Sequence, residues 1–245
     1  MCTVTWTAVG DGYVVYMNRD ELASRGSALP PSPGEVGGRR YLAPTDSDGG
    51  GTWIAATECG LTVGLLNRYP AGHAARASGA GRHRGYRSRG LLVVDLVACE
   101  NVPAVADALA RLRLESYRPF TLFAVSAHDE AAVWRWDGRG EPHRVSEPQP
   151  PLSSSSYDGE AVVARRTETY ARIVGATPTV ARLERYHASH EPVTGPYSVC
   201  AHRDDGGSRS LTRVLVSPRS VTMRYHAGPP CEPAPETEVE LPRRL

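Results

Sequence analysis

The chain has 245 residues, of which 40% are hydrophobic and 22% charged, and its formal net charge is +1. Such a composition is typical of a globular protein with a substantial core, and the near-zero charge gives no reason to expect nucleic acid as a partner. Hydrophobic runs fall short of the ~18–20 residues of a membrane span, and the N-terminus lacks the pattern of a secretory signal. We therefore expect one cytoplasmic domain over residues 1–245, without stable membrane insertion. The composition does not decide whether this domain forms homo-oligomers.

The cysteines give no sign of a metal or disulfide framework. They are odd in number, widely spaced and without a CxxC pair, at Cys2, Cys59, Cys99, Cys200 and Cys231. This pattern predicts neither a zinc site nor disulfides, and free thiols suit a reducing cytoplasm. All 28 basic residues are arginine, which fits the codon bias of a GC-rich genome.

The first third of the chain carries β-strand signals. Residues 3–9 and 13–18 are β-rich runs separated by Gly10-Asp11-Gly12, which predicts a hairpin. Residues 24–51 hold many Gly, Pro and Ser residues and predict a long surface loop. A second strand pair is expected at residues 52–57 and 61–67, followed by a mobile loop over residues 70–90.

Helical periodicity then alternates with further strand signals. Residues 90–99 and 102–114 have apolar residues at helical spacing, with Asn101 as N-cap and Pro103 in the first turn. The later expectations are strands at 120–126 and 131–136, a loop at 138–156, helices at 158–174 and 180–190, strands at 197–202, 210–217 and 220–226, and an irregular tail after Gly228. Strands and helices in separate runs indicate an α+β layered fold.

Cys2 is the first residue with distinctive chemistry. Removal of Met1 would leave a thiol and a free α-amine on one residue, with ordinary pKa values near ~8.5 and ~7.7–8.0. A nucleophile that uses its own amine as base is an established activation scheme. A small strand residue placed there by chance is the alternative.

Polar residues at three strand ends are candidates to assist Cys2. Asn18, Arg19, Asp20 and Glu21 end the second strand, where a hairpin can return them to Cys2, although alternation lets only some point toward it. Asn67 could donate to an oxyanion or simply begin a turn. Arg209 could anchor a carboxylate, with Arg213 as its competitor.

These segments together resemble a known family. The stretches MCTVTW, NRDE (18–21), GGTWIAATECGLTVGLLN (50–67) and SRGLLVVDLVA (88–98) resemble the NRDE-motif family, also called the transport and Golgi organisation protein 2 family. That family is similar to cysteine N-terminal nucleophile hydrolases such as penicillin V acylase, bile salt hydrolase and acid ceramidase. The resemblance implies a four-layer αββα fold.

The resemblance also implies roles for individual residues. Cys2 corresponds to the nucleophile, Asp20 to the carboxylate that contacts its α-amine, Asn67 to an oxyanion-hole amide, and Arg209 to a late active-site arginine. The hydrolases tend to carry an early arginine about three residues before the aspartate. This chain has Met17 at that position, so Arg19 is offset from it. Ser154, expected to bind substrate, stands where those enzymes have asparagine.

The implied function is hydrolysis or acyl transfer at a linear amide of a small acylated amine, through a Cys2 thioester and without a cofactor. One alternative is a carrier of haem or lipid, as in the haem trafficking linked to the family, with His187 and His190 on a helix as candidate haem ligands. Another is a tailoring enzyme of bacterial secondary metabolism, suggested by the arginine-only composition. Whether the protein is an enzyme is left open between these readings.

Overall fold

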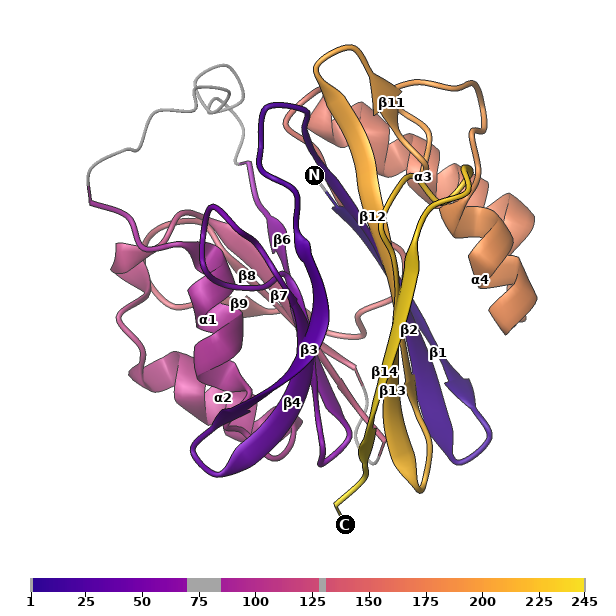
Figure 1. The fold of residues 1–245 in the computed structure, drawn as a ribbon. Coiled ribbons are helices and arrows are strands. Elements are labelled where there is room, and N and C mark those ends of the chain that lie inside the picture. The colour runs from indigo at the N-terminus through magenta and orange to yellow at the C-terminus, as the bar shows by residue number, and fades with distance from the viewer. Residues whose placement is uncertain (1, 70–84, 128–130, 245) are drawn as a thin grey trace.

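The protein folds into four layers (Figure 1), described by a computed structural model for residues 2–69, 85–127 and 131–244. Two antiparallel sheets face each other, and a pair of helices covers the outer face of each. This arrangement confirms the α+β, αββα fold expected from the sequence. Met1 and most of the expected loop at 70–90, residues 70–84, lie outside the described residues. Within the described ranges, no helix combines the length and apolarity needed to cross a membrane.

One sheet carries the N-terminal strand next to its edge strand β10. Its order is β10-β1-β2-β12-β13-β14, with β11 paired to β12. The predicted hairpin is confirmed, because Val9 of β1 pairs with Gly12 of β2 across a turn in which Gly10 has φ 55°. The strands are β1 (Cys2–Val9), β2 (Gly12–Leu22), β10 (Leu152–Ser154), β11 (His202–Arg203), β12 (Gly206–Val216), β13 (Ser220–His226) and β14 (Glu236–Pro242).

The second sheet runs in chain order from β3 to β9. Its strands are β3 (Leu29–Val36), β4 (Arg39–Thr45), β5 (Ile54–Thr57), β6 (Leu61–Asn67), β7 (Phe120–Ser126), β8 (Ala132–Trp136) and β9 (His143–Arg144). The helices are α1 (Arg89–Leu96), α2 (Val102–Arg111), the short 3-10 helix η1 (Leu114–Ser116), α3 (Gly159–Ile173) and α4 (Val180–His187). Asn101 caps α2 as predicted, by accepting a hydrogen bond from the Ala104 amide at 2.9 Å.

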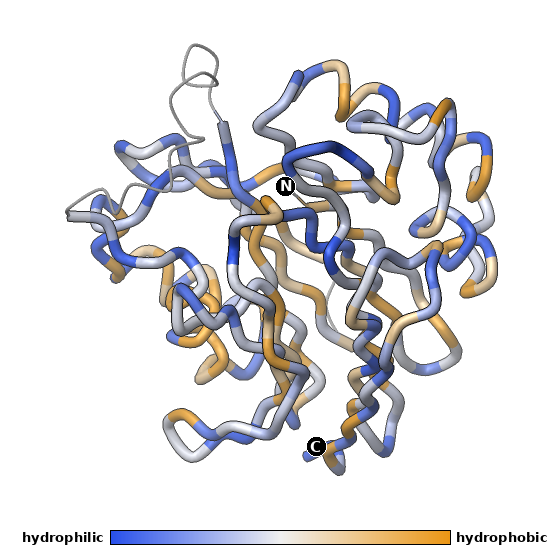
Figure 2. Tube along the Cα trace, turned by 45° about the horizontal axis from the view of Figure 1, so that its top comes forward, coloured by the Kyte–Doolittle hydropathy of each residue, from blue (hydrophilic) through white to orange (hydrophobic). Residues whose placement is uncertain are grey.

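The layers enclose three buried clusters of apolar side chains. One lies between the sheets and includes Cys2, Met17 and Trp53. The second fills the space under α1 and α2, and the third lies under α3 and α4. Hydrophobic segments, orange in Figure 2, run through the strands and helices that surround these clusters. Cys2 thus begins a strand whose inner face looks onto the other sheet.

The loop predicted at 24–51 is wrong in part, because it contains the hairpin β3–β4. Three of its four prolines lie in β3, which is an edge strand and therefore tolerates residues without an N–H group, and the fourth, Pro44, lies near the end of β4. Gly37 and Gly38, with φ 58° and 74°, form the two-residue turn that joins Val36 to Arg39. A Gly-Gly pair between two strands is a hairpin signal, and the surrounding prolines obscured it.

Three further expectations need correction. The loop expected at 138–156 contains β9 and β10, and the tail expected to be irregular contains β14, paired to β13 along its whole length. The strand expected at 197–202 is reduced to β11, although Val199 and Cys200 are fully buried. Apolar residues in that segment pack as an irregular chain, because only His202 and Arg203 find a ladder partner.

Candidate active site

Four polar residues form a row across the N-terminal sheet. In register, Cys2 pairs with Ser154 on one side and Arg19 on the other, and Arg19 pairs with Ser210. Residues opposite one another in neighbouring strands project from the same face of a sheet. Ser154, Cys2, Arg19 and Ser210 therefore face the second sheet together, and we call them the polar row.

The polar row contains hydroxyl groups that have no partner. The Oγ atoms of Ser154 and Ser210 are buried and make no hydrogen bond within the described part of the chain. Thr212 Oγ1 on β12 and Trp53 Nε1 are two further buried donors without a described hydrogen-bond partner. The Trp53 ring lies under the Arg19 guanidinium, 4.8 Å from its carbon. Buried polar groups are almost always hydrogen-bonded, so this concentration indicates a place where a polar ligand or water is bound.

Arg19 is held by an ion-pair network that begins at the end of β2. Its guanidinium lies 3.3 Å from Asp46 and 3.8 Å from Glu21, and Arg25 bonds the same Asp46 carboxylate at 2.7 Å. Although burial opposes ionisation of Asp46, the Arg25 guanidinium holds its pKa below the usual range. The charge of Arg19 is therefore fixed in place one strand away from the Cys2 thiol.

The environment of Cys2 keeps the thiol protonated near neutral pH. The residue is only 8% exposed, and burial is the main cause that raises the pKa of its thiol. Asp20 and Glu21 raise this pKa further, while Arg19 lowers it. Since the thiolate is the reactive form, attack by Cys2 requires a nearby base.

Asp20 points away from the polar row, toward α3. Its carboxylate lies 3.0 Å from Arg166 Nη1 and accepts a hydrogen bond from Ser208 Oγ at 2.7 Å. Arg166 also donates to Thr3 Oγ1 at 2.6 Å, and both members of the ion pair are fully buried. The structure brings Asp20 within electrostatic range of Cys2, but from the helix side of the sheet.

Arg166 and Arg89 are residues that sequence reasoning missed. Arg166 lies on α3 in one buried stripe with Val162, Thr169 and Ile173, and an arginine on such a stripe signals a buried acidic partner. Arg89, the first residue of α1, interacts electrostatically with Cys2, and burial lowers the pKa of its guanidinium. No spacing in the sequence relates Arg89 to Cys2, because the two residues come close only when the two sheets pack against each other.

Asn18 and His187 have a structural role. Asn18 donates to the carbonyls of His187 and Val199 at 2.9 and 3.1 Å, and its Oδ1 lies 2.8 Å from His187 Nδ1. The other ring nitrogen of His187 bonds Thr5 Oγ1 at 2.8 Å, and burial lowers the pKa of His187 to about 3. His187 is thus a neutral side chain with both ring nitrogens bonded within the fold.

The two remaining predicted residues lie on β6 and β12. Asn67, at the end of β6, donates to Tyr69 Oη at 3.2 Å. Arg209 is exposed at a bulge in β12, where the pairing with β2 shifts between Ser208 and Ser210. Its competitor Arg213 faces α4, where it lies 3.8 Å from Glu184.

A cavity of about 400 Å³ opens beside Arg19. Arg209 and Ser208 line it from β12, Tyr225 from β13, and residues 227–229 from the connection that follows β13. Cys2 does not line this cavity but is the strand partner of Arg19, which does. The cavity therefore places a second guanidinium group, that of Arg209, beside Arg19 of the polar row.

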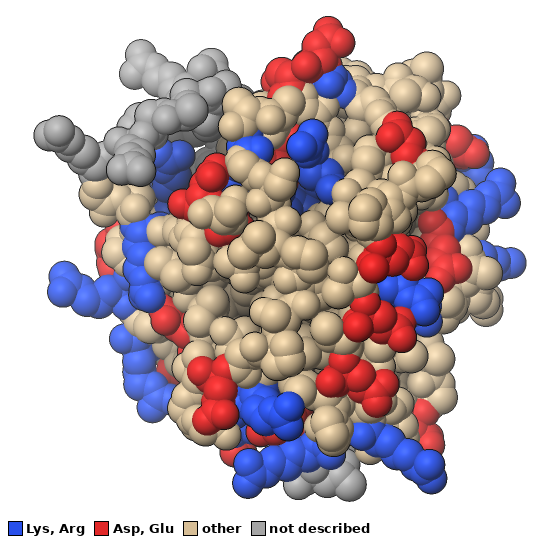
Figure 3. Space-filling model, in the orientation of Figure 1, with Lys and Arg blue, Asp and Glu red and all other residues tan. Residues whose placement is uncertain are grey.

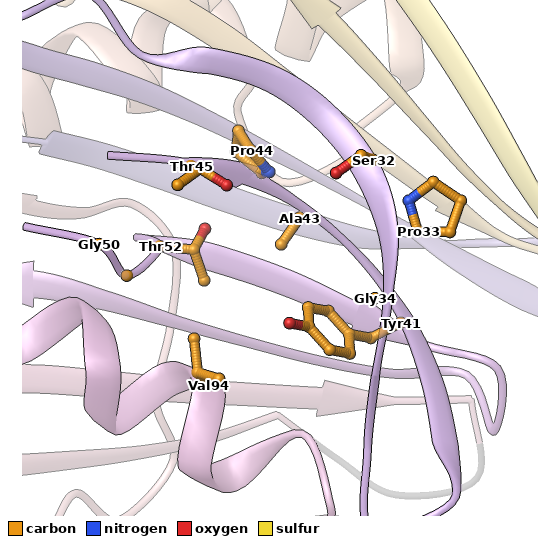
Figure 4. A pocket seen from close by; sticks show the side chains of 11 residues that line it. Ser32, Pro33, Gly34, Tyr41, Ala43, Pro44, Thr45, Gly50, Thr52 and Val94 are labelled. Atoms are coloured by element: carbon orange, nitrogen blue, oxygen red, sulfur yellow. The ribbon is translucent and has the colours of Figure 1, made fainter. Parts of the chain in front are cut away.

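Two other features of the described residues are the pattern of surface charge and a second cavity. Acidic and basic side chains are intermingled over the face seen in Figure 3. A second cavity, of about 160 Å³, lies between β3, β4 and α1 and is lined by Tyr41, Thr52 and Val94 (Figure 4). None of the predicted site residues lines it, so the polar row remains the candidate active site.

Comparison with known proteins agrees with this fold. The family model described as Transport and Golgi organisation 2 matches residues 1–179, whereas comparison with curated protein sequences gives no match. Among solved structures, penicillin V acylase from Agrobacterium tumefaciens is similar at 14% identity and TM-score 0.54, over 93% of this chain and 83% of its own.

Two other similar structures come from different enzymes. The Caenorhabditis elegans N-acylethanolamine-hydrolyzing acid amidase ortholog is 13% identical with TM-score 0.57, over 87% of this chain and 92% of its own. A variant of conjugated bile acid hydrolase from Clostridium perfringens is 9% identical with TM-score 0.59, over 100% of this chain and 97% of its own. At these identities the likeness concerns the fold.

Proposed function

This chain belongs to the Transport and Golgi organisation 2 family and has the fold of N-terminal nucleophile hydrolases, and we propose that it is a cysteine amidohydrolase or acyltransferase. Its substrate would be a small acylated amine, whose linear amide bond is broken through a thioester on Cys2. Removal of Met1 is a condition of this proposal, because it frees the α-amine that serves as base.

The observation that carries the proposal is the polar row. A thiol at the start of β1 is flanked by Ser154 of β10 and by Arg19 of β2, and both serine hydroxyls of the row are buried without a described partner. A purely structural sheet would fill such positions with apolar side chains, since an unsatisfied buried hydroxyl costs about 1–3 kcal/mol. Binding of a substrate carbonyl or amine would supply the missing partners.

The reaction proceeds in two steps on this chain's own groups. The Cys2 α-amine takes the thiol proton, the sulfur attacks the substrate carbonyl carbon, and the proton passes to the leaving nitrogen as the C–N bond breaks. Water, or a second amine, then attacks the thioester and restores the thiol. The raised pKa of the Cys2 thiol makes the amine necessary, because little thiolate is present beforehand.

Charge that develops on the substrate oxygen needs hydrogen-bond donors. Ser154 Oγ, paired in register with Cys2 and unpartnered among the described residues, is the best-placed side chain. Asn67 would join it with the second N–H of its side-chain amide, since one N–H is donated to Tyr69. Asp20, within electrostatic range of Cys2, would orient the α-ammonium or amine. Loss of one such oxyanion donor typically lowers kcat by roughly 10²–10³-fold.

The cavity suggests which acylated amines are preferred. Arg19 and Arg209 both line it, and guanidinium groups bind carboxylates through paired hydrogen bonds. We therefore expect a substrate that carries a carboxylate on its amine or acyl part, such as an N-acyl amino acid. Hydrolysis and acyl transfer differ only in which nucleophile resolves the thioester, and both remain within the proposal.

The test is to trap the thioester. The protein is incubated briefly with N-acyl amines that differ only in the presence of a carboxylate, quenched in acid and weighed intact. We expect loss of Met1 and an acyl adduct that maps to Cys2. Cys2→Ala should form no adduct, and Ser154→Ala should form it at least tenfold more slowly, on the oxyanion magnitude given above.

Cys99→Ser is the matched control for these variants, because Cys99 is also a partly buried thiol but lies between α1 and α2. It should form the adduct at the rate of the unmodified sequence. Retention of Met1 in adduct-forming protein would exclude the α-amine as base. An adduct that persists in Cys2→Ala would exclude Cys2 as nucleophile.

The haem-carrier alternative draws no support from its candidate ligands. His187 has both ring nitrogens bonded within the fold, and His190 Nε2 lies 3.2 Å from His202 Nε2. A Soret band on titration with haem, lost when one histidine is replaced, is the result that would favour that alternative.

A further inference from the structure

A second group of reactive side chains lies outside the candidate active site. His190 follows α4, Cys200 and His202 flank the start of β11, and Cys231 lies in the connection between β13 and β14. One donor atom from each residue lies within 4.8 Å of the others. Three segments far apart in the sequence therefore bring two imidazoles and two thiols to one point.

The distances between these donors resemble the edges of one tetrahedron. His190 Nε2 and His202 Nε2 are 3.2 Å apart, and the sulfurs of Cys200 and Cys231 are 3.4 Å apart. His202 Nε2 lies 3.5 Å from the Cys200 sulfur and 3.4 Å from the Cys231 sulfur. For Zn–S of about 2.3 Å and Zn–N of about 2.0–2.1 Å, tetrahedral edges are roughly 3.3–3.8 Å.

We propose that His190, Cys200, His202 and Cys231 bind one structural Zn²⁺ ion. Two thiolates and two imidazoles are a donor set of structural zinc sites, and four protein ligands leave no open position for catalysis. Magnesium and calcium prefer oxygen ligands, which this group lacks. The wide spacing of the ligands explains why the sequence predicts no zinc site, since Cys200 and His202 form the only close pair.

The ion would stabilise a segment that has little regular structure. Residues 188–201, between α4 and β11, form neither helix nor strand, yet Ser198, Val199 and Cys200 are fully buried. Few backbone bonds hold this segment, among them Cys200 N to Ser189 O at 3.0 Å. A metal that links it to the β13–β14 connection would replace the missing ladder hydrogen bonds.

The same ion would stabilise two parts of the candidate active site, the contacts of Asp20 and one wall of the cavity beside Arg19. Ala201, between the ligands Cys200 and His202, donates its amide to Ser208 Oγ at 2.9 Å, and Ser208 in turn donates to Asp20. On the other side, Cys231 follows residues 227–229, which line the cavity beside Arg19. The zinc ion would thus fix both the Asp20 support and one wall of the cavity.

A disulfide between Cys200 and Cys231 is the competing outcome. The two thiols are close enough to be oxidised after a small movement, but a disulfide would leave His190 and His202 side by side without a function. Metal binding accounts for all four residues. The two outcomes differ in metal content and in mass, because a disulfide removes two hydrogen atoms and binds no ion.

The experiment measures metal in the full chain, purified without a polyhistidine tag and with a thiol reductant. We expect one zinc per chain by inductively coupled plasma mass spectrometry. Exchange for Co²⁺ should give the intense visible bands of tetrahedral cobalt and a sulfur-to-cobalt charge-transfer band. Cys231→Ser and His190→Ala should lower zinc at least tenfold, and Cys59→Ser, which replaces a thiol outside the group, should retain it.

Circular dichroism keeps the test interpretable where a variant loses metal. Cys231 is exposed, so Cys231→Ser should retain secondary structure while losing zinc. Reduced protein with no metal and no cobalt spectrum overturns the proposal, as does a Cys200–Cys231 disulfide that binds no zinc after reduction, or iron or copper found at one per chain in place of zinc. None of these measurements depends on amide hydrolysis, so failure here leaves the thioester test unaffected.

Discussion

At the scale of single residues, the reactivity of Cys2 is set by opposing charges around a buried thiol. Burial, Asp20 and Glu21 raise its pKa, and Arg19 lowers it. The sequence identified Cys2, Arg19 and Asp20 as neighbours, since a hairpin returns the end of β2 to the start of β1. It could not tell that Arg19 shares the face of Cys2 while Asp20 lies on the opposite one, because this depends on the register of the pairing.

Replacing the two charged neighbours should shift the reactivity of Cys2 in opposite directions. In Arg19→Gln the cation that lowers the thiol pKa is gone, so the pKa rises and alkylation at neutral pH slows several-fold. In Glu21→Gln the pKa falls and alkylation accelerates. The measurement is the pH dependence of iodoacetamide labelling of Cys2, followed by peptide mass spectrometry, with the labelling of Cys99 as internal control. A shift of both profiles in the same direction would contradict this electrostatic account.

At the scale of elements, the contact between the 46–53 loop and α1 positions two groups next to the polar row. A Cβ atom on Gly51 would overlap the backbone of Gly90 and Leu91, so the two segments pack backbone against backbone, and Thr52 N bonds Gly90 O at 3.1 Å. Trp53, two residues beyond Gly51, supports Arg19, and Arg89, next to Gly90, acts on Cys2.

Gly51→Ala should therefore reduce both stability and Cys2 reactivity. Overpacking against a backbone typically costs about 1–3 kcal/mol, measured as the change in free energy of urea unfolding. Gly159→Ala is the matched control, because its added methyl group meets no atom within 4 Å at the start of α3, and loss of backbone freedom in the unfolded chain predicts a gain of about 0.4–1 kcal/mol. Equal effects of the two substitutions would refute the close-packing explanation.

The elements that escaped prediction share a physical cause. Sequence pattern located β1, β2 and β6 as β-rich runs and located α2 and α3 by helical periodicity. It missed β10, whose three residues are too short to show alternation, and β14, whose strand signal follows a run of prolines. Ser154 was singled out from the resemblance alone, and its place beside Cys2 comes from β10, a pairing between residues 152 positions apart that no local pattern encodes.

At the scale of the whole molecule, the polar contacts between the N-terminal sheet and its helices make stability depend on pH. His187 is buried and neutral, with a pKa of about 3, whereas in the unfolded chain a histidine titrates near ~6.5. Between these values the unfolded state binds one proton more than the folded state. The folded protein therefore loses roughly 1.4 kcal/mol for each pH unit below ~6.5 from this group.

His187→Gln should flatten that dependence. The free energy of unfolding of the variant should be lower at pH 7, since Asn18 and Thr5 lose their partner, but its decline between pH 6 and pH 4 should be shallower than in the unmodified chain. His143→Gln, at an exposed position on β9, should keep the original slope. Urea titrations at half-unit pH intervals make the comparison, and parallel curves for all three proteins would rule out His187 as the source.

The register of the polar row also has a consequence for the biogenesis of the protein. The row joins residues 2, 19, 154 and 210, so the thiol leaves the ribosome long before Ser210 is synthesised, by on the order of 10–40 s at roughly 5–20 residues per second. An aminopeptidase that removes Met1 can work in that interval, before β10 and β12 complete the sheet on either side of the β1–β2 hairpin. The maturation of the proposed nucleophile would then be a cotranslational event, completed before the two sheets pack around Cys2.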